Sequence, residues 1–200
     1  MYLKVEAIRD SIIKSDELRF GDDFAWEVKI IKQDVLNAFA APGGFIYVYT
    51  GLIEFLESED HFAGVMVHEV ADADRRHTVN QQAKNAGVSL LFSALLGDES
   101  AITSLATGLL SLRHSRVDES DADEWSVRYL CSTTYKANGA AGFFRQIEGG
   151  SSQPEFLSTH PNPENRVENI DQMSDDLGCP GTSPGDDWGD IQTLSRNSSL

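Results

Sequence analysis

The feature that most constrains the fold is an apolar segment with ionisable side chains in its middle. Four apolar residues recur there at helical spacing and predict a buried helix: Phe62, Val65, Met66 and Val70. Ser58 precedes the segment and suits the N-cap position. The same helix carries His68, Glu69 and Asp72. Because unpaired polar groups are costly inside a protein, these residues predict either a metal site or a hydrogen-bonded core network.

The polar residues of this helix differ at one position from a metal-binding pattern. In H-E-x-x-H, two histidines one helical turn apart hold zinc, and the glutamate is the general base for metal-activated water. His68 and Glu69 fill the first two positions, and Asp72 stands where the second histidine belongs. An Asp carboxylate reaches roughly 1 Å less far than a His Nε2, against a tolerance of ~0.2 Å in a good site. Asp72 also adds a negative charge, so we expect weakened zinc binding and low or absent activity.

A second segment, about fifty residues later, carries acidic side chains that could complete this metal site. Glu119 and Asp123 are spaced i, i+4, so one helix face presents both carboxylates. In gluzincins, such a glutamate is the third zinc ligand, and an acid four residues on orients a ligating histidine. An acidic helix is usually a solvated surface when it stands alone, but its pairing with His68 and Glu69 favours the metal site. We predict that His68, Glu119 and Asp123 converge.

Four motifs in order resemble those of the zinc metallopeptidases of peptidase family M48. They are the hairpin sequence Asn37–Gly44, His68-Glu69 with Arg76-His77, Glu119–Asp123 as E-x-x-A-D, and Ser158–Pro161 followed by Pro163, Glu164, Asn165 and Arg166. The resemblance extends from about Trp26 to Arg166. It implies a mostly helical α+β fold, a zincin-like domain with a small β-sheet or hairpin beside the motif helix.

The resemblance also implies roles for individual residues around one zinc ion, which Asp72 would weaken or abolish. The implied metal ligands are His68, Glu119 and, in place of histidine, Asp72; Glu69 is the base, Asp123 orients a ligand, and His160 stabilises the anionic intermediate. A polypeptide substrate would add to the hairpin edge as an extended strand, along Phe39, Ala40, Gly43 and Gly44. We predict that this edge is exposed and faces the motif helix.

Other histidines are poorer candidates. His77 lies nine residues after His68, which places it on the opposite helix face. His114 is a lone histidine near Glu119, and we do not expect it to contact the metal. Without the other motifs, His160 would be interpreted as a loop histidine before a proline.

The length and composition fit one domain. The 200 residues, 40% of them hydrophobic, suffice for a single core, which we assign to residues 1–177. Around the motif helix, the patterns predict a helix over residues 3–19, a strand over 24–31 and a long helix from about 100 to 131. The Gly-, Pro- and Asp-rich segment 178–200 predicts an irregular, partly mobile tail. Cys131 and Cys179 could form one disulfide or remain two thiols.

The charge of the chain excludes two classes of partner. A formal net charge of −16 argues against nucleic acid and against anionic membrane surfaces. No apolar run approaches the ~20 residues that span a bilayer, and no secretory leader precedes the domain. The chain as given is therefore predicted to be soluble and without a transmembrane segment. The family resemblance is compatible with a periplasmic or membrane-associated full-length protein.

Three functions compete at this stage. The first is a zinc-dependent endopeptidase impaired by Asp72, and the second is an inactive pseudopeptidase that binds extended peptides or partner proteins. The third is an acidic helical scaffold that only inherited the motifs. A scaffold has no need of Glu69, Glu119, Asp123 and His160, so their presence favours the first function over the third. Asp72 favours the second over the first.

Overall fold

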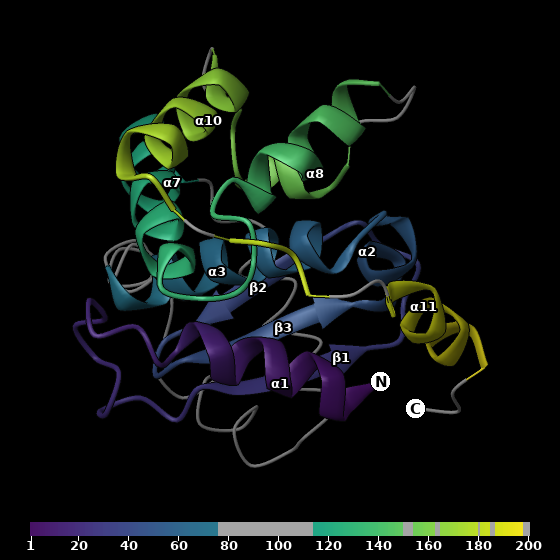
Figure 1. Cartoon of the computed structure of the whole chain (residues 1–200). Coiled ribbons are helices and arrows are strands. Elements are labelled where there is room, and N and C mark those ends of the chain that lie inside the picture. The colour runs from purple at the N-terminus through teal and green to yellow at the C-terminus, as the bar shows by residue number, and fades with distance from the viewer. Residues whose placement is uncertain (76–113, 150–153, 163–164, 180, 185–186, 198–200) are drawn as a thin grey trace.

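A small sheet and the helix α3 form the centre of the molecule (Figure 1). The computed structural model describes residues 1–75, 114–149, 154–162, 165–179, 181–184 and 187–197. Within these ranges the elements are α1 (Tyr2–Ile12), β1 (Glu27–Ile31), β2 (Ala38–Ala41), β3 (Phe45–Tyr49), α2 (Thr50–Phe55), α3 (Glu59–Asp74), α7 (Arg116–Cys131), α8 (Gly139–Glu148), α9 (Phe156–Thr159), α10 (Arg166–Leu177) and α11 (Trp188–Asn197). The fold is therefore α+β and mostly helical, as predicted.

The sheet has the strand order β1–β3–β2. Strands β1 and β3 are parallel, and β2 and β3 are the antiparallel arms of the predicted hairpin. Gly43 and Gly44 form the turn with φ angles of 93° and 81°, which favour glycine. A Cβ on Gly44 would also approach the Trp26 backbone nitrogen to 3.0 Å. The assignment of these two glycines to the substrate strand is therefore corrected: they lie in the turn, and β2 ends at Ala41.

Helix α3 begins where the sequence predicts, and it is buried, as its apolar stripe predicts. The Ser58 hydroxyl caps it by accepting a hydrogen bond of 3.2 Å from the His61 backbone N–H. All residues of the helix from Glu59 to Asp74 except His61 are buried, because α3 packs against β2, β3, α1, α7 and α8. Its approach to α8 depends on Gly64, where a Cβ would lie 2.1 Å from the Ala140 backbone nitrogen.

Helix α7 starts at a strong cap. The Ser115 side chain and Asp118 form a reciprocal capping box, so the helix begins at Arg116. The part of the predicted 100–131 helix that precedes residue 114 lies outside the described residues.

Helix α1 ends at Ile12 instead of residue 19, and β1 begins at Glu27 instead of residue 24. None of the helices in the described ranges combines the length and apolar character needed to cross a bilayer.

The C-terminal segment is not an irregular tail, which corrects the prediction for residues 178–200. Helix α11 presents Trp188 and Ile191 to the core, where they are 1% and 3% exposed. The Trp188 indole N–H donates to the Leu56 carbonyl at 2.7 Å, and its ring lies 5.0 Å from that of Phe62. A disulfide joins Cys131 at the end of α7 to Cys179 after α10. The Gly and Pro content obscured a short apolar stripe that suffices to dock a helix.

We predict that Trp188→Ala lowers the free energy of unfolding by about 3–5 kcal/mol, the usual cost of truncating a buried tryptophan. Urea denaturation of the full chain measures this change. Leu194 lies on the same helix but is 50% exposed, so Leu194→Ala should stay within ~0.5 kcal/mol of the wild type. Equal effects of the two substitutions would contradict a docked α11.

Candidate metal centre

Two helices that are separate in the sequence bring the predicted site residues together. Helix α3 supplies His68, and the first two turns of α7 supply Glu119 and Asp123. His68 Nε2 lies 3.4 Å from Glu119 Oε2, and His68 Nδ1 lies 3.1 Å from Asp123 Oδ1. The predicted convergence of these three side chains is confirmed. All three are buried, with exposed fractions of 1%, 0% and 4%.

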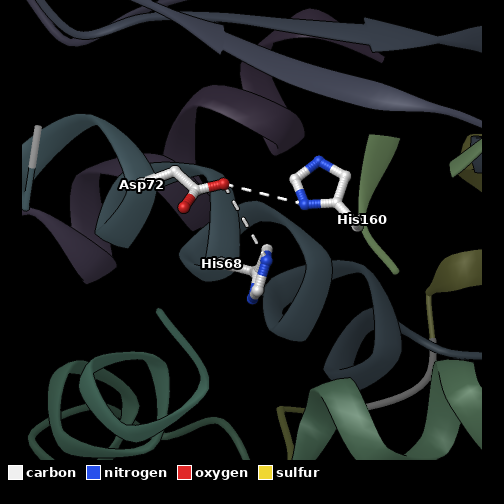
Figure 2. Close-up of side chains that lie close together, drawn as sticks. All are labelled: His68, Asp72 and His160. Carbon is white, nitrogen blue, oxygen red and sulfur yellow. Dashed lines mark ion pairs between the residues drawn. The ribbon is translucent and has the colours of Figure 1, made fainter. Parts of the chain in front are cut away.

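His68, Asp72 and His160 form a group of donor atoms that can hold a metal ion (Figure 2). Asp72 Oδ2 lies 3.9 Å from His68 Nε2 and 3.7 Å from His160 Nδ1. Ligand atoms around a tetrahedral zinc, with bonds of ~2.0–2.2 Å, are about 3.3–3.6 Å apart. Glu119 Oε1 is 3.0 Å from His160 Nδ1, so Glu119 belongs to the same cluster. A small contraction would bring these atoms to ligand distances.

Unsatisfied buried atoms provide a second test of this fit. Within the described part of the chain, His68 Nε2 and Glu69 Oε1 are shielded from solvent and make no hydrogen bond. Leaving a buried polar atom without a partner costs about 1–3 kcal/mol. The unbonded Nε2 of His68 faces the carboxylates of Asp72 and Glu119. The residues present therefore fit a cation.

Arg166 is a site residue that the sequence did not reveal, although it belongs to a quoted motif. It is 2% exposed and donates two hydrogen bonds of 2.7 Å to the Asp123 carboxylate. Its Nη2 also lies 2.9 Å from Glu119 Oε2, and its guanidinium lies over the Phe144 ring at 3.9 Å. The motif shows an arginine at this position but cannot show that it is buried against two carboxylates.

Glu69 lies between the hairpin edge and His160. It is 1% exposed, and the backbone of Ala40 in β2 hydrogen-bonds its carboxylate. His160 Nε2 is 3.5 Å from Glu69 Oε1. Burial, followed by the charge of Asp72, raises the pKa of Glu69 to about 8 in the metal-free protein. The carboxyl group is therefore a much stronger base than an exposed glutamate.

The pKa values of His68 and Glu119 shift in opposite directions. Although burial alone would lower it, the adjacent carboxylates of Asp123 and Glu119 raise the pKa of His68 well above its usual value. Against the effect of burial, His160 and His68 hold the pKa of Glu119 well below its usual range. Without a metal, the cluster therefore takes up protons on His68 and Glu69 to offset its negative charge.

The surroundings of the site differ in part from the predicted ones. Strand β2 packs against α3 as predicted, but Phe39 and Ala40 are only 7% and 4% exposed. Ala40 lies in the hydrophobic core, and Phe39, on the opposite face of the strand, stacks on Tyr47 with ring centroids 4.7 Å apart. His114 was not expected to contact the metal, and it is not part of the donor group, although its Nδ1 lies 3.8 Å from Asp72 Oδ1. His160 was expected across the cleft, and the structure brings it into the donor group. His77 lies outside the described residues.

The fold and the site define a metallopeptidase. One buried helix carries His68 and Glu69, and a later helix contributes Glu119 and Asp123. Residues 3–174 match the sequence profile of Peptidase family M48. The chain therefore belongs to this family, whose members are metallopeptidases and whose chemistry requires a metal.

Similar proteins support the same assignment. The chain is 30% identical over 159 residues to "Mitochondrial metalloendopeptidase OMA1" of Schizosaccharomyces pombe, covering 75% of the chain and 47% of that protein. The Arabidopsis thaliana protein of the same name is 29% identical over 159 residues, covering 76% and 32%. "Putative beta-barrel assembly-enhancing protease" of Vibrio cholerae is 28% identical over 156 residues, covering 69% and 32%. The match thus spans about a third to a half of each of these relatives.

We predict that the metal-free protein loses stability as the pH rises from about 7.5 to 8.5. In this window the unfolded chain has lost nearly all of both protons, because His and Glu then titrate near 6.5 and 4.5, whereas the folded protein retains protons on His68 and, in part, on Glu69 because both pKa values are raised. Burial lowers the pKa of His160, so that residue is neutral in both states here. The free energy of unfolding should fall by up to ~1.4 kcal/mol per pH unit for each proton.

Urea denaturation with a chelator present, repeated across this pH range, measures the slope. Glu69→Gln cannot titrate and should show a shallower slope than the wild type. A free energy of unfolding that rises with pH, or identical slopes for the two proteins, would contradict the assignment of a proton to Glu69.

Proposed function

We propose that this chain is the catalytic domain of a zinc-dependent endopeptidase that hydrolyses peptide bonds in a polypeptide substrate. The observation that carries the proposal is the position of Glu69. Its buried carboxylate lies beside the donor group of His68, Asp72 and His160, and it contacts the edge strand β2. A base, a metal site and a strand edge thus meet at one place. The substrates of the longer relatives carry no information about this chain.

His68, Asp72 and Glu119 would hold the metal. A bound zinc supplies an activated water molecule and polarises the scissile carbonyl group. His68 Nδ1 lies 3.1 Å from Asp123 Oδ1, so Asp123 would accept the Nδ1–H and leave the Nε2 lone pair for the metal. Arg166 in turn fixes Asp123 through two hydrogen bonds. These contacts orient the ligand ring before any metal binds.

Glu69 would move the proton. A carboxyl group with a pKa raised to about 8 can accept a proton at neutral pH and later donate it to the leaving amine. The hydrogen bond from Ala40 now occupies this carboxylate. A peptide that pairs with the edge of β2 would take over this backbone donor and free Glu69 for proton transfer.

His160 would stabilise the negative charge that develops on the scissile carbonyl oxygen. Its ring stacks on Phe156 with centroids 4.3 Å apart and an interplanar angle of 14°, which fixes the ring plane. Nδ1 faces Glu119 at 3.0 Å, so Nε2, on the side of Glu69, is the nitrogen that can donate to the oxyanion.

The substrate would bind as an extended strand against β2. Among the described residues, β3 is the single strand that pairs with β2, so its outer edge has no strand partner. Such an edge recruits a peptide through backbone hydrogen bonds. Because Phe39 and Ala40 are buried, binding also requires the surface over this edge to open.

Asp72 favours one alternative function, a pseudopeptidase that binds extended peptides or partner proteins without cleaving them. A carboxylate at this position reaches less far and adds negative charge, and both effects weaken the activation of water. The same strand edge would serve for binding. The substitution of Asp72 separates the two functions.

We predict that Asp72→His tightens zinc binding and raises peptidase activity by at least about tenfold, equivalent to ~1.4 kcal/mol of transition-state stabilisation. The imidazole restores the nitrogen ligand on the helix face of His68 and removes one negative charge. Competition with a chromophoric chelator measures zinc affinity, and cleavage of unstructured casein measures activity.

Two variants control for charge and for the base. Asp72→Asn removes the charge without supplying a nitrogen ligand, and it should not reproduce the gain. Glu69→Gln combined with Asp72→His should retain zinc and lose the activity. If Asp72→His changes neither zinc content nor cleavage, the endopeptidase proposal fails and peptide binding becomes the better function.

For His160 we predict that His160→Phe, made together with Asp72→His, lowers the cleavage rate by about 10²–10³-fold, as expected for removal of an oxyanion donor. Phenylalanine preserves the stacking on Phe156. Zinc content, measured by elemental analysis, should remain at one ion per chain. Loss of the zinc together with the activity would make His160 a metal ligand and would refute its role at the oxyanion.

A further inference from the structure

The two oxygens of the Asp72 carboxylate face different histidines. Oδ2 faces the donor group, 3.9 Å from His68 Nε2 and 3.7 Å from His160 Nδ1. Oδ1 lies 3.8 Å from His114 Nδ1. One oxygen is therefore directed toward the metal-binding group, and a third imidazole lies beside the other oxygen.

His114 is held in this position by contacts on two sides. It directly precedes Ser115, the cap of α7, and its backbone N–H donates to the Thr159 carbonyl at 2.9 Å. Its ring stacks on that of His160 with centroids 4.8 Å apart and an interplanar angle of 11°. The α7 cap, the end of α9 and the His160 ring thus fix an imidazole next to Asp72.

The Nδ1 atom of His114 is buried and makes no hydrogen bond within the described ranges of the chain. The residue is 8% exposed, so solvent does not readily satisfy this nitrogen. A buried polar atom without a partner requires an explanation. The nearby carboxylate oxygen of Asp72 provides one, since contraction of the donor group around a metal would also move this carboxylate.

We propose that His114 is a positioning residue for Asp72, and that the pair Asp72–His114 replaces the single second histidine of the H-E-x-x-H pattern. This inference rests on the proposed zinc site. A hydrogen bond from His114 Nδ1–H to Asp72 Oδ1 would orient the carboxylate so that Oδ2 faces the metal. It would also draw negative charge away from the ligating oxygen, which offsets part of the disadvantage of a carboxylate ligand.

This arrangement is the usual pairing of a metal ligand with its hydrogen-bond partner, except that the histidine and the carboxylate exchange places. In most metal sites a carboxylate or carbonyl accepts the free N–H of a ligating histidine. Here a histidine would donate to a ligating carboxylate. The present separation exceeds a hydrogen bond by about 0.8 Å, which side-chain torsions of the two residues can close.

A purely structural role for His114 is the competing explanation, because its ring also packs on His160. Two substitutions separate the functions of this side chain. His114→Phe keeps an aromatic ring for stacking and removes the donor. His114→Asn loses the ring, but its amide nitrogen can occupy the place of Nδ1 and donate to Asp72.

The test is a cycle of zinc affinities, measured on the full chain by chelator competition. In the wild-type background, His114→Phe should weaken zinc binding by about 10-fold or more, the usual effect of removing an outer partner. His114→Asn should stay within about threefold of the wild type. With Asp72→His present, His114→Phe should change the affinity by less than about threefold, because no carboxylate remains to be oriented.

His61 provides the matched control, since it lies in the first turn of α3, away from the donor group. His61→Gln should leave zinc affinity unchanged in both backgrounds. Thermal melting of each variant shows whether it is folded. If His114→Phe does not fold, His114→Leu removes the same donor and takes its place in both backgrounds.

The results of this zinc-affinity cycle can be told apart from the results of the peptidase assays. Equal losses for His114→Phe in the two backgrounds, or no loss in the wild type, would overturn the positioning role. A wild-type protein that binds no zinc would overturn it as well. Coupled zinc affinities without any peptide cleavage would support the Asp72–His114 pair and contradict the endopeptidase.

Discussion

Four buried carboxylates clustered around the donor group impose the constraint on which this structure depends. Glu69, Asp72, Glu119 and Asp123 are each at most 4% exposed. Removing a carboxylate from water costs several kcal/mol unless a cation or hydrogen bonds compensate. The guanidinium of Arg166 compensates part of this charge through Asp123 and Glu119. A divalent cation at the donor group would compensate most of the rest, so metal binding and folding are linked.

Local features of the fold were predictable because local residues determine them. The Ser58 cap, the β2–β3 hairpin and the i, i+4 pair of Glu119 and Asp123 all follow from neighbouring positions in the chain. The convergence of His68 with that pair was also predictable, since metal coordination requires it. The ordered motifs therefore predicted the family and the centre of the site.

The partners that complete the site were not predictable, because tertiary packing decides them. Arg166 lies 98 residues from His68 and contacts the same acidic pair. His114 had no motif of its own, and the cap of α7, the tether to Thr159 and the stacking on His160 together bring it to Asp72.

The disulfide between Cys131 and Cys179 has a consequence for how the protein must be prepared. The two cysteines are separated by 48 positions, and the covalent loop between them contains both His160 and Arg166. Glu119 and Asp123 lie on α7, just before the loop begins. Such bonds form and persist in oxidising compartments and are reduced in the cytosol. Protein expressed in a reducing host would carry the loop open, so its metal content should be judged only after the thiols have been counted.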